Sequence, residues 1–352
     1  MSNIPSISIA GRRIAADAPP YIIAELSANH NGKLETALKI IEEAKKAGAD
    51  AIKLQTYTAD TITLDCDSED FQIHGGLWDG KTLYQLYQEA HMPWDWHATL
   101  FEHARKLGIT IFSSPFDNTA VDLLENLNAP AYKIASFEAV DLPLIKYVAS
   151  TGKPMIISTG MADAEEIQEA IDAAHEGGCK DLAILHCVSG YPAPAADYNL
   201  RTIPDMMRRF GLVTGLSDHT LDNTTAIASV VMGASIIEKH FTLDRRGGGP
   251  DDSFSLEPVE LAALCKDSNT AWKALGGVDY GRKSSEIDNA KFRRSLYFVK
   301  DIKAGDVITI DSVRSVRPGF GLPPKNLQKI LNKRAKLDIG AFTPTSFELL
   351  SD

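Results

Sequence analysis

Eight short apolar runs alternate with amphipathic stretches through most of the chain, and this alternation strongly restricts the possible folds. The runs are 21–26, 51–56, 110–115, 131–136, 154–159, 182–187, 212–217 and 235–241. Segments such as LETALKIIEEAKKAG separate them, with apolar residues at helical spacing and Gly48 at the stop. Strands with few polar residues, joined by helices, are typical of a parallel sheet buried on both faces. Eight such units predict an α/β fold of the (β/α)₈ TIM-barrel type rather than an open doubly wound sheet.

Regions outside this alternation predict additional parts. The N-terminal SISIAGRRIA is typical of a short hairpin with Gly11-Arg12 at its turn. The stretch 60–94 is too long for a simple loop, which favours a lid or binding loop. We expect a barrel domain over 1–275 and a Gly- and Lys-rich linker over 276–291. Short strands, an Ala-Gly-Asp turn, Pro-Gly and Pro-Pro over 292–352 predict a small, mostly β module.

Composition excludes several classes of function. The formal net charge of −11 argues against a nucleic-acid-binding surface but leaves room for a small anionic ligand in a basic cleft. The chain has no long uninterrupted apolar tract, which argues against a membrane protein, and its N-terminus lacks the apolar core of a signal peptide. Its four cysteines are scattered, without a Cys-x-x-Cys pair. We therefore expect a cytoplasmic protein with reduced thiols.

Polar residues recur where the predicted strands end, which is where TIM barrels place their active sites. One such residue is more often a structural hydrogen-bonding group than a catalyst, and Ser158 could simply cap a helix. Lys53 and Lys133 are harder to explain structurally, because a lysine in an apolar parallel strand must find an anion. Two inward lysines favour a phosphate or carboxylate ligand.

Two histidines are the metal-ligand candidates. His219 and His240 end adjacent predicted strands, so their imidazoles can converge. With water and substrate oxygens they would suit Mn²⁺, Fe²⁺, Co²⁺ or Zn²⁺. Glu238 shares a strand face with His240, and it could orient a ligand, hold a substrate hydroxyl or pair with a lysine. Lys239 falls on the other face.

Ordered motifs then carry a family resemblance. AELSANHNG, DAIKLQTYT, FSSPFD, YKIASFE, ISTGMA, GLSDHT, IIEKHFT and GPDDSFS resemble, in this order, the sialic acid synthase family. The tail RRSLYFVKDIKAGDVIT…RPGFGLPP resembles that family's antifreeze-like (SAF) domain. Within the family, GGLWDGKTLYQLYQEAHMPWDWHATLF is most similar to the pseudaminic acid branch, with the N-acetylneuraminate and legionaminate branches as alternatives. The chain departs from many relatives at Ala195 and Ala196, in a loop expected to touch the sugar.

The resemblance implies a transferase that condenses phosphoenolpyruvate with an N-acetylated deoxy amino sugar in its open-chain aldehyde form. For the pseudaminic acid branch, the sugar is 2,4-diacetamido-2,4,6-trideoxy-altropyranose, and phosphate leaves by C–O cleavage. By motif, Lys53 and Lys133 would hold the phosphate and carboxylate of phosphoenolpyruvate. Further substrate-binding residues implied by the motifs are Gln55, Ser114, Ser136, Ser158, Tyr191, Ser217 and Glu238.

The resemblance also assigns the acceptor side and the metal. Glu25 and Asp251 would contact the sugar, and Glu138 is the candidate for proton transfer. His219 and His240 would bind a divalent metal, expected to be Mn²⁺, with Mg²⁺ or Co²⁺ as alternatives. Arg317 in RPGFG would reach the active site of the partner subunit, because the family forms domain-swapped homodimers.

Two functions of other kinds stay open on the residues alone. Lys133 inside the barrel could form a Schiff base with a carbonyl substrate, as in an aldolase. Alternatively, the C-terminal module could bind carbohydrate or ice on an inert barrel, but that hypothesis leaves the lysines and histidines at the strand ends unexplained.

Overall fold

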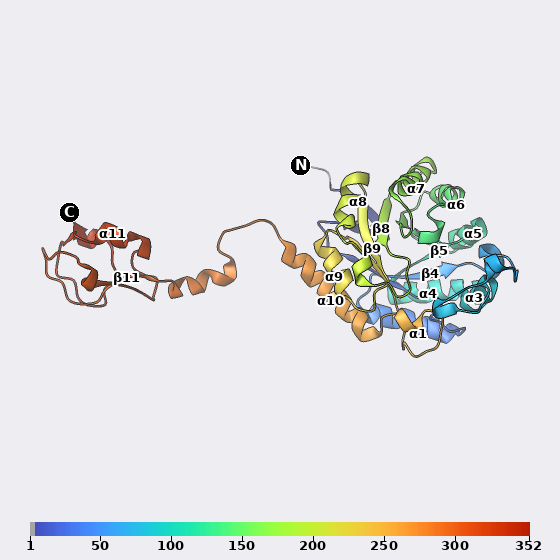
Figure 1. Cartoon of the computed structure of the whole chain (residues 1–352), viewed down its shortest axis with the longest axis horizontal. Helices are drawn as coiled ribbons and strands as arrows, with labels where there is room; N and C mark the ends of the chain where they lie inside the picture. Colours follow the sequence, from blue (N-terminus) through green and yellow to red (C-terminus); the bar gives the residue numbers. More distant parts are fainter. Residues whose placement is uncertain (1–3) are drawn as a thin grey trace. The chain divides into compact units, whose positions relative to one another are not determined.

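A computed structural model describes residues 4–352, which divide into two compact units, one ending at Gly276 and the other spanning Gly277–Asp352 (Figure 1). In the first unit eight strands close into a barrel in the order β10-β3-β4-β5-β6-β7-β8-β9, and all neighbours are parallel. The predicted TIM barrel is therefore confirmed. Its strands are β3 (Tyr21–Glu25), β4 (Ala51–Thr56), β5 (Thr110–Pro115), β6 (Tyr132–Ile134), β7 (Met155–Ser158), β8 (Leu182–Cys187), β9 (Val213–Asp218) and β10 (Ile236–His240).

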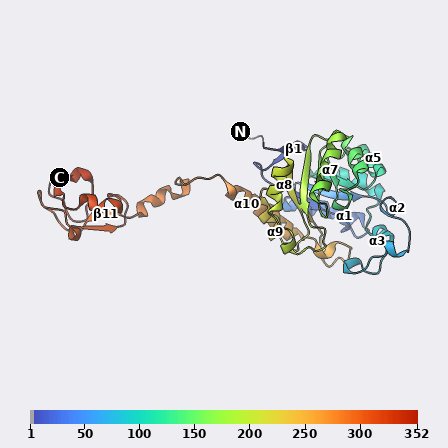
Figure 2. The ribbon, with the colours of Figure 1, turned by 45° about the horizontal axis from the view of Figure 1, so that its top comes forward.

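Helices surround the strands, as two views of the chain show (Figures 1 and 2). In α1 the buried Ala37, Ile40, Ile41 and Ala44 recur at helical spacing, and Gly48 ends the helix with a φ of 95°. Across residues 4–352, no helix has both the length and the apolar character needed to span a membrane. The barrel helices are α1 (Leu34–Ala47), α4 (His97–Leu107), α5 (Asn118–Asn126), α6 (Leu142–Ala149), α7 (Ala164–Glu176), α8 (Thr202–Phe210), α9 (Thr224–Val231) and α10 (Pro258–Leu275).

A β-hairpin precedes the barrel and packs against its interior. Its strands are β1 (Ser6–Ile9) and β2 (Arg12–Ala15). The turn is Ala10-Gly11, because these two residues have positive φ, and not Gly11-Arg12 as the sequence predicted. The hairpin isoleucines join one buried cluster with residues from the first halves of the strands, which makes that end of the barrel apolar. The members of the cluster are Ile7, Ile9, Ile14, Tyr21, Ile23, Ala51, Phe112, Ala131, Ile156, Ala183, Leu185, Val213 and Ile236.

The long segment between β4 and α4 is folded and tied to the opposite end of the strands. It contains α2 (Ala59–Ile62) and α3 (Leu83–Ala90) with short 3₁₀ turns. The Trp94 indole donates to the Tyr57 carbonyl at 3.2 Å, and the Trp78 indole donates to the Pro250 carbonyl at 3.1 Å. The segment therefore contacts the loop that follows β10, and its role as a lid stays a prediction.

The second unit is small and built from paired antiparallel strands. β11 (Ser295–Phe298) pairs with β12 (Val313–Val316), and β13 (Arg334–Ala335) pairs with β14 (Leu350–Ser351). The only α-helix described in this unit is α11 (Leu327–Ile330), and the stretch expected to be a linker contains most of a 3₁₀ helix over Ser284–Phe292. The second unit has its own core, which consists of Leu296, Phe298, Ile302, Ile308, Val313, Ile330, Ala335, Ile339 and Leu350.

Candidate active site

A cluster of buried charges lies at the carboxyl ends of the barrel strands. The Lys53 ammonium is 2.7 Å from Glu25 Oε2 and 3.7 Å from Glu238 Oε1, and all three side chains are buried. Burial raises the pKa of Glu25, partly offset by Lys53. Burial also acts against the charged forms of Lys53 and Glu238, but their attraction outweighs it, so the pKa of Lys53 is raised and that of Glu238 is lowered.

Lys133 lies in the same interior without a carboxylate partner. Its side chain is 1% exposed, and its ammonium donates to the Ile134 carbonyl at 2.7 Å. No carboxylate in residues 4–352 lies within ion-pair distance of it. Burial lowers the pKa of Lys133 to about 8, although Glu238 acts in the opposite direction. A buried cation without a counter-ion is a site prepared for an anion.

Hydroxyl groups surround the two lysines. Ser114 accepts a hydrogen bond from Lys53 at 3.3 Å, and Ser217 donates to Glu238 at 3.4 Å. Ser136 accepts from the Gly160 backbone N–H at 3.2 Å, while the buried Ser158 hydroxyl has no partner. Gly160 permits this approach, because a Cβ there would lie 2.8 Å from Ser136 Oγ and 2.3 Å from Ser189 Oγ.

Glu138 follows β6 and faces the Lys133 region. Burial raises the pKa of Glu138 to about 7, although its own backbone hydrogen bond and the charge of Lys133 lower it. Its buried Oε2 has no hydrogen-bond partner. A carboxyl group with a pKa near neutrality can accept or donate a proton under physiological conditions.

The two predicted metal ligands converge, with ring centroids 5.5 Å apart. The Val188 carbonyl lies 2.8 Å from His219 Nδ1 and fixes that imidazole, while the buried Nδ1 of His240 has no hydrogen-bond partner. Burial and the neighbouring charges of His219 and Lys53 hold the pKa of His240 well below its usual range. The ring of Tyr191, which precedes a cis peptide bond to Pro192, lies 4.3 Å from His219 and 6.1 Å from His240.

These imidazoles fit a divalent metal as a two-histidine set. A metal needs neutral imidazole, which the lowered pKa of His240 supplies. At His219 burial also favours the neutral ring, but Cys187 and the Val188 carbonyl raise its pKa, so a metal bound there would displace a proton. The Asp251 carboxylate is 3.8 Å from His240 Nδ1. Within the described residues, no group of three or more His, Cys, Asp or Glu side chains is arranged to hold a metal. Other coordination positions would therefore belong to water and substrate, and the metal stays a prediction.

A hydrogen-bonded chain joins the residues predicted for the acceptor sugar. The Gln55 amide donates to Glu25 Oε1 at 2.9 Å and to Ser27 Oγ at 3.0 Å. The Ser27 hydroxyl in turn donates to Asp251 Oδ2. Burial raises the pKa of Asp251, partly offset by that bond. The structure thus brings Glu25, Gln55 and Asp251 together through a serine that the sequence pattern did not single out.

Cys187 is a second residue that the sequence interpretation missed. It is the last residue of β8, and although burial acts to raise the pKa of its thiol, the neighbouring His219, Ser136 and Lys133 lower it. Because other polar strand-end residues were read as site candidates, the same rule applied to cysteine would have found it. Arg317 lies in the second unit, beside Phe292, Arg293 and Arg294 in a hollow of about 570 Å³.

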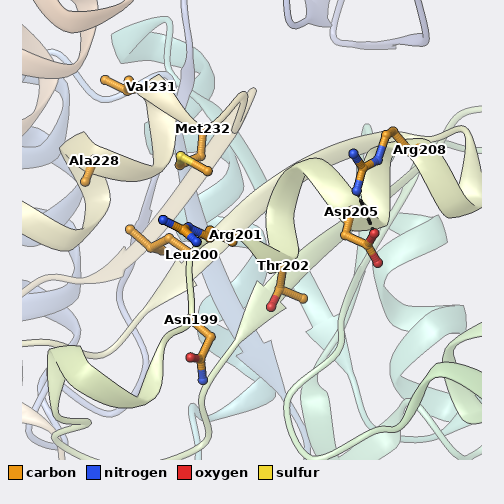
Figure 3. Close-up of a pocket in the computed structure, with 9 residues that line it drawn as sticks. All are labelled: Asn199, Leu200, Arg201, Thr202, Asp205, Arg208, Ala228, Val231 and Met232. Atoms are coloured by element: carbon orange, nitrogen blue, oxygen red, sulfur yellow. Dashed lines mark hydrogen bonds and ion pairs between the residues drawn. The ribbon is translucent and has the colours of Figure 1, made fainter.

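Another hollow, of about 960 Å³, lies on the outside of the barrel between α8 and α9 (Figure 3). It holds one ion pair, Asp205 with Arg208 at 2.8 Å, and none of the residues predicted from the sequence. We therefore assign the candidate active site to the strand ends.

A closed parallel barrel with buried ammonium, carboxylate and imidazole groups at its strand ends defines a TIM-barrel enzyme. The chain belongs to the NeuB family, whose model matches residues 40–280, and a SAF domain model matches residues 293–344.

Two curated relatives and one solved structure give the range of similarity. The pseudaminic acid synthase of Campylobacter jejuni serotype O:23/36 is 46% identical over 92% of this chain and 94% of its own length. The N,N'-diacetyllegionaminic acid synthase of C. jejuni serotype O:2 is 38% identical over 89% and 95%. The N-acetylneuraminic acid synthetase of Leptospira borgpetersenii, crystallised with citrate, aligns with a TM-score of 0.73 at 31% identity, covering 83% of this chain and 98% of that one.

Proposed function

We propose that this enzyme is a pseudaminic acid synthase. It condenses phosphoenolpyruvate with 2,4-diacetamido-2,4,6-trideoxy-β-L-altropyranose and water to give pseudaminic acid and phosphate. Greater identity to a pseudaminic acid synthase than to a legionaminic acid synthase supports the choice of acceptor. The observation that carries the reaction class is Lys133, a buried ammonium without a carboxylate partner beside a second buried lysine.

The lysines bind the anionic substrate. Phosphoenolpyruvate carries a phosphate and a carboxylate, and Lys53 and Lys133 supply two buried positive charges at the strand ends. The Ser158 hydroxyl, which lacks a protein partner, is free to donate to a substrate oxygen, and Ser136 and Ser217 are the other hydroxyls expected to contact the substrate. Binding would give Lys133 the counter-ion that the protein does not provide.

The remaining groups manage protons while the bonds rearrange. C3 of phosphoenolpyruvate bonds to the aldehyde carbon of the open-chain sugar, whose oxygen takes up a proton and becomes a hydroxyl. Water adds at C2 and loses one proton, which leaves a hydroxyl on C2. The bond from C2 to the phosphate oxygen then breaks as that hydroxyl gives its proton to the departing phosphate, and the products are the ketone and phosphate. Glu138, with its pKa raised to about 7, is the residue that takes the proton from the attacking water. Glu25 and Asp251, joined through Gln55 and Ser27, hold the sugar.

His219 and His240 would hold a divalent metal, with Mn²⁺ expected. When bound, the ion supplies Lewis-acid polarisation of a carbonyl oxygen. The Val188 carbonyl orients the His219 imidazole, and Tyr191 covers both rings.

A second subunit completes the site in this proposal. Arg317, beside two further arginines, is the residue expected to reach the partner's barrel in a domain-swapped homodimer. Mixing Arg317→Ala subunits with His240→Ala subunits tests this, because a swapped heterodimer contains one intact site. Recovery of activity on mixing supports the exchange, and no recovery contradicts it. Four free cysteines fit the cytoplasmic assignment that belongs to this proposal.

Phosphate release over a panel of acceptors tests the reaction. We expect turnover with the altrose derivative to exceed turnover with N-acetylmannosamine or the legionaminate precursor. ¹⁸O in the bridging oxygen of phosphoenolpyruvate should appear in the released phosphate, because the C–O bond breaks. Preference for N-acetylmannosamine would instead identify an N-acetylneuraminate synthase.

The lowered pKa of Lys133 also favours one competing mechanism, a Schiff-base aldolase. Treatment with pyruvate and borohydride distinguishes the two. We expect no covalent label on Lys133, and a labelled lysine would replace the condensation proposed here.

A further inference from the structure

Ser27 has a backbone conformation that suits glycine better than serine. It follows β3, and its φ is +47°. The Asn29 N–H donates to the Leu26 carbonyl at 3.1 Å, which closes a four-residue turn with Ser27 in second position. Glycine, asparagine and aspartate dominate that position when φ is positive. Serine at this turn therefore carries backbone strain that glycine would avoid.

The strain at Ser27 is also unusual in its location. Eight non-glycine residues in the described part of the chain have positive φ, and four of them are asparagines, which tolerate this region. Ala10, Met161 and Phe342 are exposed, whereas Ser27 is 3% exposed and lies at the candidate active site. A strained residue that persists at a buried functional site points to a use for its side chain.

The Ser27 hydroxyl connects three neighbouring strand ends. It accepts from the Gln55 amide of β4 at 3.0 Å and donates to Asp251 in the loop after β10. Strands β10, β3 and β4 are consecutive in the barrel. Because the hydroxyl donates to Oδ2 of Asp251, it restrains the direction in which this carboxylate can accept a hydrogen bond from a ligand.

We propose that Ser27 is a positioning residue for the acceptor sugar, whose hydroxyl holds the Asp251 carboxylate and the Gln55 amide in the orientation that binds the sugar. The inference rests on the proposed function, since it takes these two groups as sugar contacts. The chemistry recognised is that of a polyhydroxylated acetamido sugar, whose O–H and N–H groups need fixed acceptors. Phosphoenolpyruvate binds through the lysines. Lys53 meets this chain of bonds only at Glu25, and Lys133 does not meet it, so binding of phosphoenolpyruvate should depend far less on Ser27.

Three variants separate the hydroxyl from the backbone. Ser27→Ala removes the hydroxyl and keeps the strain, whereas Ser27→Gly removes both. Ala10→Gly relieves a matched φ of +49° in the exposed turn of the N-terminal hairpin, far from any strand-end residue. Thermal unfolding reports the strain, and steady-state kinetics of the full chain report KM separately for each substrate.

We expect both Ser27 variants to raise KM for the acceptor about tenfold, the loss expected for one hydrogen bond to a charged group. KM for phosphoenolpyruvate should stay within about twofold of wild type. Tm should be higher for Ser27→Gly than for Ser27→Ala, and Ala10→Gly should keep wild-type kinetics.

Three results would overturn the inference. Unchanged acceptor KM in both variants shows that the hydroxyl has no role in binding. Wild-type kinetics in Ser27→Gly alone show that acceptor binding does not need the hydroxyl. An equal rise in KM for the acceptor and for phosphoenolpyruvate shows that the substitution disturbs the whole active site and not acceptor binding alone. Failure of the proposed function differs from all three, because wild-type protein then releases no phosphate with any acceptor, and both proposals fall together.

Discussion

Strand β10 separates two buried polar clusters that differ in whether their hydrogen bonds are complete. The outer cluster is Lys239 with Asp218, Thr220 and Asp222, on the face of the strand that points away from the barrel interior. The inner cluster is the strand-end site, in which Glu238 and His240 share the opposite face of the same strand. Both clusters contain a lysine that is almost fully buried.

The outer cluster is satisfied by the protein itself. The Lys239 ammonium contacts Asp218 Oδ2 at 2.9 Å, the Thr220 carbonyl at 2.7 Å and the Asp222 carbonyl at 2.8 Å. An ammonium has three donors, and each has an acceptor here. These bonds also fix the loop that carries His219, so the outer cluster supports the site without belonging to it.

The inner cluster is left incomplete. Lys133 has no carboxylate, and buried atoms of four other side chains have no hydrogen-bond partner: Glu138 Oε2, Ser158 Oγ, Glu238 Oε2 and His240 Nδ1. Since unsatisfied buried polar groups cost free energy, their concentration at one place indicates a ligand that satisfies them. Single unpartnered atoms, such as Ser268 Oγ and Asn269 Oδ1, also occur elsewhere in the described residues, so the candidate site is marked by the gathering of such atoms around an unpaired lysine.

The largest effect should come from His240, whose imidazole has an unpartnered nitrogen in the inner cluster. His240→Ala should lower kcat about 10³-fold, because it removes one of the two groups proposed to hold the metal. Tm should not fall by more than a few degrees, about the shift of 1 kcal/mol. Removal of metal with EDTA should cause a similar loss, restored by Mn²⁺. Full activity in EDTA-treated protein would remove the metal from the proposal.

Lys133→Met tests the buried lysine that has no carboxylate partner. We expect kcat/KM to fall about 10²- to 10³-fold, because the variant loses a buried positive charge that would bind the anionic substrate. The free energy of unfolding should not fall, since the native lysine has no counter-ion to lose. Denaturant unfolding alongside kinetics measures both. A marked loss of stability would mean that Lys133 is already satisfied by the protein, and the distinction between the clusters would fail.

The same substitution at Lys239 should act in the opposite way. Lys239→Met leaves the Asp218 carboxylate buried without its partner, which should cost about 3 kcal/mol of unfolding free energy. Adding Asp218→Asn should recover part of that loss, because the uncompensated charge disappears. Urea unfolding of the two single variants and the double variant gives the free energies of unfolding for this double-mutant cycle. Additive losses would show that the pair is not coupled.

Much of this architecture was predictable because the signals are periodic. The eight strands follow apolar runs, and the rule that TIM-barrel sites lie at strand ends selects Lys133, Glu138 and His240 from the sequence. The contacts that distinguish the clusters are not periodic. The partners of Lys239 depend on the register of β10 against β9 and on the path of the following loop.

Ser27 shows a second limit of sequence interpretation. Its contribution depends on a turn with positive φ, in a residue type that seldom adopts it, and on a carboxylate 224 positions away. No local pattern carries that information. The hairpin turn was misplaced by one residue for a similar reason, since alanine rather than arginine takes the positive φ beside Gly11.

The smallest expected effect concerns Glu138, the inner-cluster carboxyl whose pKa is raised to about 7. As a proton acceptor it must be ionised, so kcat/KM should rise with pH and level off above about pH 7. Glu138→Gln should lose this rise of kcat/KM with pH. It should retain roughly one-hundredth of the plateau value, because the smallest rate enhancement usual for general base catalysis is about 10²-fold. A rise that persists in the variant would assign the proton transfer to another group.

The pH dependence of stability in wild type and Glu138→Gln checks the direction of the Glu138 pKa shift independently. Because the folded-state pKa is raised from 4.5, the folded protein binds the Glu138 proton more tightly than the unfolded chain does. The resulting stabilisation is fully present below about pH 4.5 and is lost as pH rises through about 7. Wild type should therefore lose more Tm than Glu138→Gln between these two pH values. Parallel curves would show that Glu138 is already charged in the folded protein and belongs with the satisfied groups.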